Sequence, residues 1–394
     1  MLLLKTAFKN IVSNGKRAWL NVIVLSFCFG IMVLYASIVD GFVEQTQTDA
    51  RLWEYADGQI VHPSYDRFDV FTLTDAHGKV PKVLTSLIEN KTLEPILAAQ
   101  ASFYPNGRMQ NVQLKGIDPK QTIIKIPTQI LQKSGAASED IPVLIGKRMA
   151  KSAKIKKGDR IMLRWRDAKG VFDARKVFVA DIFDTTVMGV DAGVLWVSLP
   201  LMQELMGMQG EATYLLKSDE AVLPTALDGW RFLPKEELMA DLILMAEDGE
   251  VEMVIITIIL LSIALLAVFD TQMLSIFRRQ KEIGTYIALG MTPKGVMLLF
   301  SLEGTLYSVL ALLFTLFWGI PFFHWYADVG FSYGEMAEAA GIPVAHVIYP
   351  KYNIEKIGFL TLLLLFFSAW ISYLPTRRIA RQSVVMALKG KGGF

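Results

Sequence analysis

Long apolar segments and short alternating segments divide this chain into regions of two kinds. Four segments stay apolar over about 20 residues, the length at which a helix crosses a hydrocarbon layer about 30 Å thick. Within the apolar cores of these segments the only charged residues are Asp270, in the second, and Glu303, in the third. The pattern therefore predicts four transmembrane helices, at residues 18–43, 251–277, 296–323 and 357–374.

Residues 44–250, between the first two apolar segments, have a mixed pattern. Short runs rich in β-forming residues, such as 160–165 and 194–198, alternate with helical runs such as 146–153 and 235–245. About 200 residues are enough to fold as a separate domain. The fold class that we predict is an α-helical membrane protein with a large mixed α/β domain inserted between transmembrane helices 1 and 2.

The distribution of charge predicts the orientation in the membrane. Lysine and arginine predominate in residues 1–17, 278–295 and 375–394, whereas acidic residues gather at the other ends of the apolar segments. By the positive-inside rule, the three basic segments lie in the cytoplasm, and both termini with them. Residues 1–17 also place their apolar side chains on one helical face, which predicts an amphipathic helix lying in the membrane surface. The domain 44–250 and the loop 324–356 are then extracytoplasmic.

Composition and motifs argue against chemistry within the chain. Its 394 residues are 53% hydrophobic, and its single cysteine, Cys28, lies in the first apolar segment, which excludes an intramolecular disulfide. The sequence has no Gly-x4-Gly-Lys-Ser/Thr loop for ATP, and its four histidines lack the spacing of metal ligands. Ser332 lies in a Gly-x-Ser-x-Gly motif, but a loop between two membrane helices cannot supply the large sheet that a nucleophile elbow requires. We expect no enzyme activity, cofactor or metal site in this chain.

The two intramembrane carboxylates raise the question of function, because a charge within a membrane helix is costly. Asp270 and Glu303 both fall toward the cytoplasmic ends of their predicted helices. An interfacial position, or pairing between helices, explains such residues without a transport role. A proton relay needs further polar partners near the middle of the membrane, and the sequence shows none.

A basic cluster stands out in the otherwise acidic α/β domain. Residues 147–176 contain twelve basic residues and three acidic ones. One interpretation is a strand pair with a solvated basic face; the other is a docking surface for an acidic partner protein or for lipid headgroups. Nucleic acid is not expected outside the cytoplasm. The candidate docking residues are Lys151, Lys154, Lys156, Lys157, Arg160, Arg164 and Arg166.

The cytoplasmic segment between the second and third helices has the pattern of a short helix. It begins with two arginines, continues through an apolar centre, and ends in a Gly-Met-Thr-Pro turn. We predict a helix parallel to the membrane over 282–292. Because a bare loop has little use for Ile283, Ile287 and Leu289, we expect a partner to bury them.

These cytoplasmic residues resemble a known family. Glu282-Ile-Gly284, Ala288-Leu-Gly290 and Glu303-Gly304 are similar to motifs of FtsX-like, or MacB-type (type VII), ABC transporter permeases. Weaker similarities run along nearly the whole chain and include residues 6–11, 115–119 and 375–388. The layout is closest to that of the lipoprotein-releasing permeases.

The resemblance implies a permease subunit that transmits force rather than forming a channel, in a homodimer or heterodimer of the bacterial inner membrane. A separate ATPase subunit, which holds ATP and Mg²⁺, would grip the cytoplasmic helix. The residues implied for this coupling are Arg278, Arg279, Glu282, Ile283, Gly284, Ile287, Ala288, Leu289 and Gly290. The leading hypothesis is extraction of lipoproteins or another lipidated substrate and transfer to a periplasmic carrier. The alternatives are efflux with a periplasmic adaptor and an outer-membrane duct, or a non-transporting regulator of cell-wall hydrolases or of peptide sensing.

Overall fold

The computed structural model describes residues 16–132, 140–332 and 347–379. These residues form two compact units, a helical unit (16–43, 245–332 and 347–379) and an α/β unit (44–132 and 140–244). Most of the predicted amphipathic helix 1–17 and most of the tail 375–394 lie outside the described residues. The described ends of these two segments extend the neighbouring long helices.

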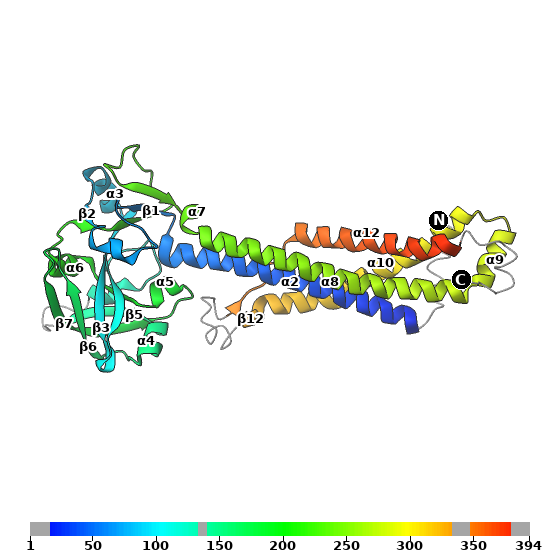
Figure 1. The fold of residues 1–394 in the computed structure, drawn as a ribbon, viewed down its shortest axis with the longest axis horizontal. Coiled ribbons are helices and arrows are strands. Elements are labelled where there is room, and N and C mark those ends of the chain that lie inside the picture. The colour runs from blue at the N-terminus through cyan, green and yellow to red at the C-terminus, as the bar shows by residue number, and fades with distance from the viewer. Residues whose placement is uncertain (1–15, 133–139, 333–346, 380–394) are drawn as a thin grey trace. The chain divides into compact units, whose positions relative to one another are not determined.

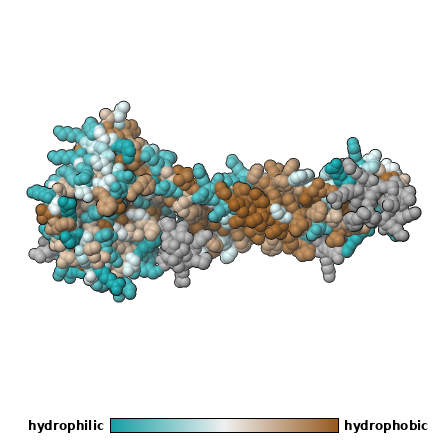
Figure 2. All heavy atoms as spheres, in the orientation of Figure 1, coloured by the Kyte–Doolittle hydropathy of each residue, from teal (hydrophilic) through white to brown (hydrophobic). Residues whose placement is uncertain are grey.

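Four helices in the described residues are long and apolar enough to cross a membrane: Trp19–Tyr55, Ala240–Arg278, Pro293–Val329 and Ile354–Arg377. They correspond to α2 (Lys16–Ala50), α8 (Ala240–Arg278), α10 (Pro293–Val329) and α12 (Ile354–Ile379) (Figure 1). Hydrophobic side chains gather over the helical unit (Figure 2). Each helix includes one of the apolar segments found in the sequence.

The third long helix corrects the predicted loop 324–356, which is shorter than expected. α10 continues through His324 to Val329 and ends where Gly330 adopts a φ of +72°, with its amide bonded to the carbonyl oxygen of Tyr326. This positive φ favours glycine, and the backbone leaves the helical conformation at this residue. The described part of the connection to α12 includes a two-stranded sheet of β12 (Phe331–Ser332) and β13 (Val347–Ile348).

The helical unit is held together by an apolar core and by close packing at glycines. α2 contributes Leu25 and Phe29 to the core that it shares with the other three long helices. A Cβ atom on Gly30 of α2 would lie 2.6 Å from the ring of Trp318 in α10, so only glycine fits there. The Nε1–H of the same tryptophan donates to Oγ of Ser26 at 2.8 Å. Packing and a partly buried hydrogen bond therefore fix α2 against α10.

The α/β unit is built around a closed six-stranded barrel. Its nine-stranded sheet has the order β11-β1-β10-β3-β4-β8-β5-β7-β6, and β6 also pairs with β3, which closes the last six strands into a barrel (Figure 1). The pairs β4–β8 and β5–β7 are parallel, and the other barrel pairs are antiparallel. The barrel strands are β3 (Leu93–Tyr104), β4 (Gln110–Ile117), β5 (Ile141–Gly146), β6 (Arg160–Arg166), β7 (Phe172–Phe183) and β8 (Val194–Ser198).

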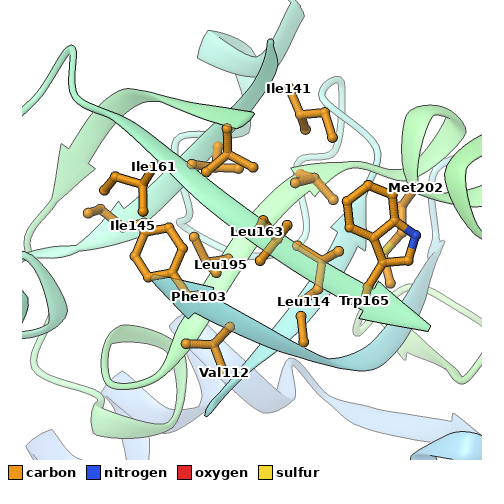
Figure 3. Packing of buried hydrophobic residues seen from close by; sticks show 14 of the residues in the cluster. Phe103, Val112, Leu114, Ile141, Ile145, Ile161, Leu163, Trp165, Leu195 and Met202 are labelled. Carbon is orange, nitrogen blue, oxygen red and sulfur yellow. The ribbon is translucent and has the colours of Figure 1, made fainter. Parts of the chain in front are cut away.

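Alternation along the strands fills the barrel with apolar side chains. On β6, Ile161, Leu163 and Trp165 are buried, whereas the residues between them are exposed. Phe103 of β3 and Leu195 of β8 belong to the same core (Figure 3). Because full burial of one large apolar side chain contributes about 1.5–3 kcal/mol, this core stabilises the barrel and turns the polar residues of β6 outward.

The remaining elements of the α/β unit are short. The strands β1 (Gly58–Val61), β10 (Tyr214–Lys217) and β11 (Arg231–Pro234) extend the sheet, and β2 (Gly78–Lys79) pairs with β9 (Glu211–Ala212). The α-helices are α3 (Thr85–Glu89), α4 (Lys147–Ala153), α5 (Met188–Asp191), α6 (Leu199–Met206) and α7 (Lys235–Leu238). A π-helix, η1 (Arg51–Tyr55), follows α2, and 3-10 turns lie at η2 (Val70–Thr74), η3 (Lys82–Leu84), η4 (Pro105–Gly107) and η5 (Thr128–Gln132).

Candidate coupling site

The segment between α8 and α10 folds as a short helix, α9 (Gln280–Ala288). Gly290 follows it with a φ of +93°. Thr292 caps α10 by accepting on Oγ1 a hydrogen bond of 3.2 Å from the amide three residues later. Pro293 then takes the first position of α10, where the amide hydrogen that proline lacks has no helical partner. The helix is shorter than the predicted 282–292 because its last residues form this turn.

The apolar side of α9 is buried by the chain itself. Ile283 is 1% exposed and packs against Ile276, Val296 and Phe300, which come from α8 and α10. Ile287 is half-buried against the same cluster. This corrects the expectation that a partner is needed to bury the two isoleucines. Their packing instead attaches α9 to the start of α10.

Leu289 differs from the two isoleucines, because it is 81% exposed. It lies just past the end of α9, and its neighbours Ala288 and Gly290 are also exposed, as is Arg278. Gly284 is buried on the opposite side. A leucine held in solvent beside a fixed turn is a surface that a partner protein can cover.

Arg279 is bound inside the chain rather than presented to a partner. Its Nε donates to Glu282 at 2.7 Å, and its Nη1 donates to Oε2 of Glu303 at 3.1 Å. Its guanidinium also lies 5.1 Å from the ring centroid of Phe300. Burial by itself lowers the pKa of Arg279, but the bonds and charges of the two glutamates outweigh this and raise the pKa. We had predicted that Arg279 belongs to the coupling surface. In the structure, Arg279 forms an ion pair with Glu303.

Glu303 lies next to a close contact between three long helices. The following residue, Gly304, leaves no room for a side chain: a Cβ atom would lie 2.1 Å from Oγ of Ser372 in α12 and 2.8 Å from Nε2 of Gln272 in α8. Gln272 has no exposed surface, and neither of its amide atoms has a hydrogen-bond partner among the described residues. Sequence reasoning missed Gln272, whose only signal is an amide within an apolar segment.

Asp270, the other predicted intramembrane carboxylate, has a different environment. It is exposed on α8 between Leu266 and Leu274, which are 61% and 52% exposed. No described residue forms an ion pair or a hydrogen bond with its side chain. The structure therefore does not bring Asp270 and Glu303 together, although the sequence placed both at similar depth.

A second ionic contact, which the sequence analysis missed, joins the other ends of three helices. Lys356 of α12 approaches Asp40 of α2 at 2.5 Å and Glu250 of α8 at 3.3 Å. The sequence contains a signal for this contact. A lysine precedes the fourth apolar segment, and acidic residues lie at the end of the first segment and at the start of the second.

The predicted basic cluster is distributed over a strand, a helix and a loop. Arg160, Arg164 and Arg166 point outward from β6, so this strand and β7 form a pair with an exposed basic face. Lys157 pairs with Asp181 at 2.8 Å. The members that lie off the strand are Lys151 in α4, Lys154 at its end, and Lys156 and Lys157 in the following turn.

The structure does not support a catalytic role for the Gly-x-Ser-x-Gly motif. Ser332 lies in β12, whose sheet with β13 has two residues per strand. Such a ribbon differs from the large sheet that a nucleophile elbow needs. Over the described ranges, no group of three or more His, Cys, Asp or Glu residues is arranged to hold a metal ion.

The helices and the site together define a membrane protein with a short, internally braced helix between two long apolar ones. Residues 254–384, which include most of α8 and all of α9, α10 and the described α12, match the family model of the FtsX-like permease C-terminal domain. The match covers about a third of the chain and supports the resemblance to FtsX-like ABC permeases, which are transmembrane subunits that generally work with a partner ATPase subunit. A search of curated proteins found no match.

Proposed function

We propose that this chain is the permease subunit of a type VII ABC transporter, and that a separate ATPase subunit, which binds ATP and Mg²⁺, docks on α9. One observation carries this proposal: Leu289, just past the end of α9, is exposed to solvent, while Ile283 and Arg279 fasten the same helix to α10. A helix attached in this way passes a displacement on to the long helices. The chain would thus act as a lever driven by a partner.

Two contacts resist slippage between α9 and α10. The packing of Ile283 opposes separation, because exposing a buried isoleucine costs about 1.5–3 kcal/mol. The bond between Arg279 and Glu303 opposes sliding, because sliding would separate a buried carboxylate from the guanidinium that pairs with it. A push at Leu289 therefore moves α9 and the first turns of α10 together.

The charge distribution supports an orientation with both termini in the cytoplasm and the α/β unit in the periplasm of a bacterial inner membrane. A second permease subunit, identical or different, would complete the transporter. The layout favours a lipidated substrate such as a lipoprotein. The exposed apolar side of α8 also suits an acyl chain. A periplasmic carrier would receive the substrate, and the basic face of β6 would bind that carrier if its surface is acidic.

The proposal is tested by co-purification with an ABC ATPase co-expressed from the same organism. Leu289→Asp places a charge on the exposed apolar surface and should release the ATPase. Ile354→Asp is a matched control, because Ile354 is 85% exposed at the start of α12, far along the chain from α9. Release by the first variant alone supports the proposal. Equal ATPase recovery with both variants contradicts docking at α9, and ATP hydrolysis by the purified chain alone contradicts the need for a partner.

The lipidated substrate needs an experiment of its own. Proteoliposomes that contain the chain, its ATPase and a fluorescent diacylated lipoprotein should release the lipoprotein when ATP is added. The Leu289→Asp variant should show no ATP-dependent release. A complex that hydrolyses ATP without releasing the lipoprotein would leave the permease proposal in place and remove the substrate class.

A further inference from the structure

A turn of the α/β unit displays two phenylalanines to solvent. In residues 66–72, here named the aromatic turn, Phe68 is 73% exposed and Phe71 is 80% exposed. Val70, between them, is 44% exposed. Single exposed apolar residues are ordinary, but a group of three with two aromatic rings is typical of an interaction site.

Hydrogen bonds hold the aromatic turn in one shape. Oδ1 of Asp66 accepts from the amide of Phe68, and Oδ1 of Asp69 accepts from the amide of Phe71, both at 2.9 Å. The hydroxyl of Thr72 donates to the carbonyl oxygen of Asp69 at 2.7 Å. A surface that is already ordered loses little conformational freedom on binding.

The start of the turn is also anchored to a distant part of the α/β unit. Arg67 donates to the carbonyl oxygen of Leu238 and pairs with Asp241 at 2.9 Å. Its guanidinium stacks on Phe68, 4.3 Å from the ring centroid. Several specific contacts thus hold the aromatic side chains in place.

The aromatic turn adjoins the basic face of the barrel. Gln100 of β3 donates to the carbonyl oxygen of Val70 at 2.6 Å. Ser102 lies on the same face of β3, two residues along, and is paired with Arg164 of β6. The guanidinium of Arg164 lies 4.2 Å from the ring centroid of Phe172, which is itself 61% exposed. Aromatic and cationic groups therefore follow one another across a single surface.

Three cations on this surface have no carboxylate partner among the described residues. Arg164, Arg166 and Lys176 form no ion pair with a carboxylate of any residue that the structure describes. Neighbouring Arg160, by contrast, is paired with Asp140 at 2.5 Å. Buried aromatic side chains and arginines are the residue types that most often dominate the energy of a protein interface.

We propose that the aromatic turn and the β6–β7 face form one docking surface for an acidic protein. Phe68 and Phe71 would enter an apolar cleft of that protein, and its acidic rim would meet Arg164, Arg166 and Lys176. The inference rests on the proposed function in placing this surface outside the cytoplasm. A protein fits better than an anionic membrane, because a protein can offer the rings an apolar cleft and keep its acidic rim away from Asp66 and Asp69, whereas anionic headgroups would surround these two carboxylates.

The first step of the test is photo-crosslinking of the full chain in its host cells. A benzophenone amino acid replaces Phe71 in one strain and Val222 in another. Val222 serves as the control because it is 84% exposed but belongs neither to the turn nor to the barrel face. A single protein adduct at position 71, absent at position 222, is the expected result. The absence of a protein adduct at position 71, or a phospholipid adduct there, overturns the proposal.

The second step measures binding of the protein recovered in that adduct to the purified full chain in nanodiscs. Phe68→Ala with Phe71→Ala should weaken binding by roughly 30-fold, as loss of interface anchors does. Arg164→Glu should weaken it by a similar factor, and Val222→Ala should leave it unchanged. Equal binding by all variants overturns the proposal. The alanine variants leave α9 intact. If they lose no binding but the ATPase still co-purifies, the docking surface is wrong while the proposed function stands.

Discussion

Arg279 and Glu303 join the beginning of α9 to α10 through an ion pair of 3.1 Å whose carboxylate has no exposed surface. The outer edge of the same guanidinium binds Glu282, which is 56% exposed. One arginine thus pairs with a buried carboxylate and with an exposed one. The two ion pairs should therefore contribute differently to the free energy of unfolding.

Arg279→Met should destabilise the helical unit by about 3 kcal/mol, because it removes the guanidinium that pairs with the buried carboxylate of Glu303. Glu282→Gln should cost less than about 1 kcal/mol, because water already solvates that carboxylate. Equilibrium unfolding in mixed detergent micelles measures both. Adding Glu303→Gln to the first variant should restore much of the loss. A double variant no more stable than Arg279→Met would contradict a dominant charge effect.

Gly304→Ala should disturb the junction of α8, α10 and α12. Its Cβ atom would overlap Ser372, so the helices must separate or the serine must change rotamer, at a cost of about 1–3 kcal/mol. Gly358→Ala in α12 is the matched control, since no atom lies within 4 Å of the added Cβ. Thermal unfolding of the two variants makes the comparison. Similar unfolding midpoints for the two variants would show that the junction accommodates the added methyl group without loss of stability.

Glu94 should make the α/β unit less stable as pH rises. Burial raises the pKa of this carboxyl from 4.5 to about 8, although a hydrogen bond from the amide of Asp118 partly opposes the shift. Between these values the folded unit keeps a proton that the unfolded chain has lost. Stability therefore falls across this window, by up to about 1.4 kcal/mol per pH unit.

Glu94→Gln keeps an acceptor for the Asp118 amide but cannot ionise, so it should reduce this pH dependence. Unfolding of the full chain, followed by hydrogen exchange in β3 at pH 5.5 and 7.5, measures the difference. The variant should gain stability relative to the wild type at the higher pH. An identical change in both proteins would assign the pH dependence to other groups.

Membrane orientation can be tested with two exposed lysines. In a Cys28→Ala background, Lys169→Cys should react with an impermeant thiol reagent added to spheroplasts, because we place the β6–β7 turn outside the cytoplasm. Lys294→Cys, at the start of α10, should react only after permeabilisation. The reverse pattern would overturn the orientation derived from the basic segments.

The long helices were predictable because about 20 apolar residues in succession have few alternatives to a membrane helix. Their ends were less predictable. α10 passes through His324 and stops only where Gly330 takes a positive φ, which local polarity does not reveal. β3 was missed for a related reason. Its sequence, rich in alanine and leucine, has little strand propensity of its own, and pairing with β4, β6 and β10 determines its structure.

The candidate site was predictable in position but not in detail. Ile283 and Leu289 carry the same apolar signal in the sequence, yet one is buried by α8 and α10 and the other is exposed. Likewise, Asp270 and Glu303 look alike until the fold brings Arg279 to only one of them. Burial and pairing depend on neighbours that are distant in the chain, so residue type and spacing alone cannot assign them.

The closed barrel also restricts how another protein can recognise the α/β unit. Closure gives β6 a partner on each side, and the nine-stranded sheet ends instead at β11, a strand of four residues that finishes with Pro234. In the nine-stranded sheet, a partner therefore finds little free backbone on which to add a strand of its own. Recognition of the barrel then depends on side chains, and single substitutions on its surface can change the choice of partner while the backbone stays as it is.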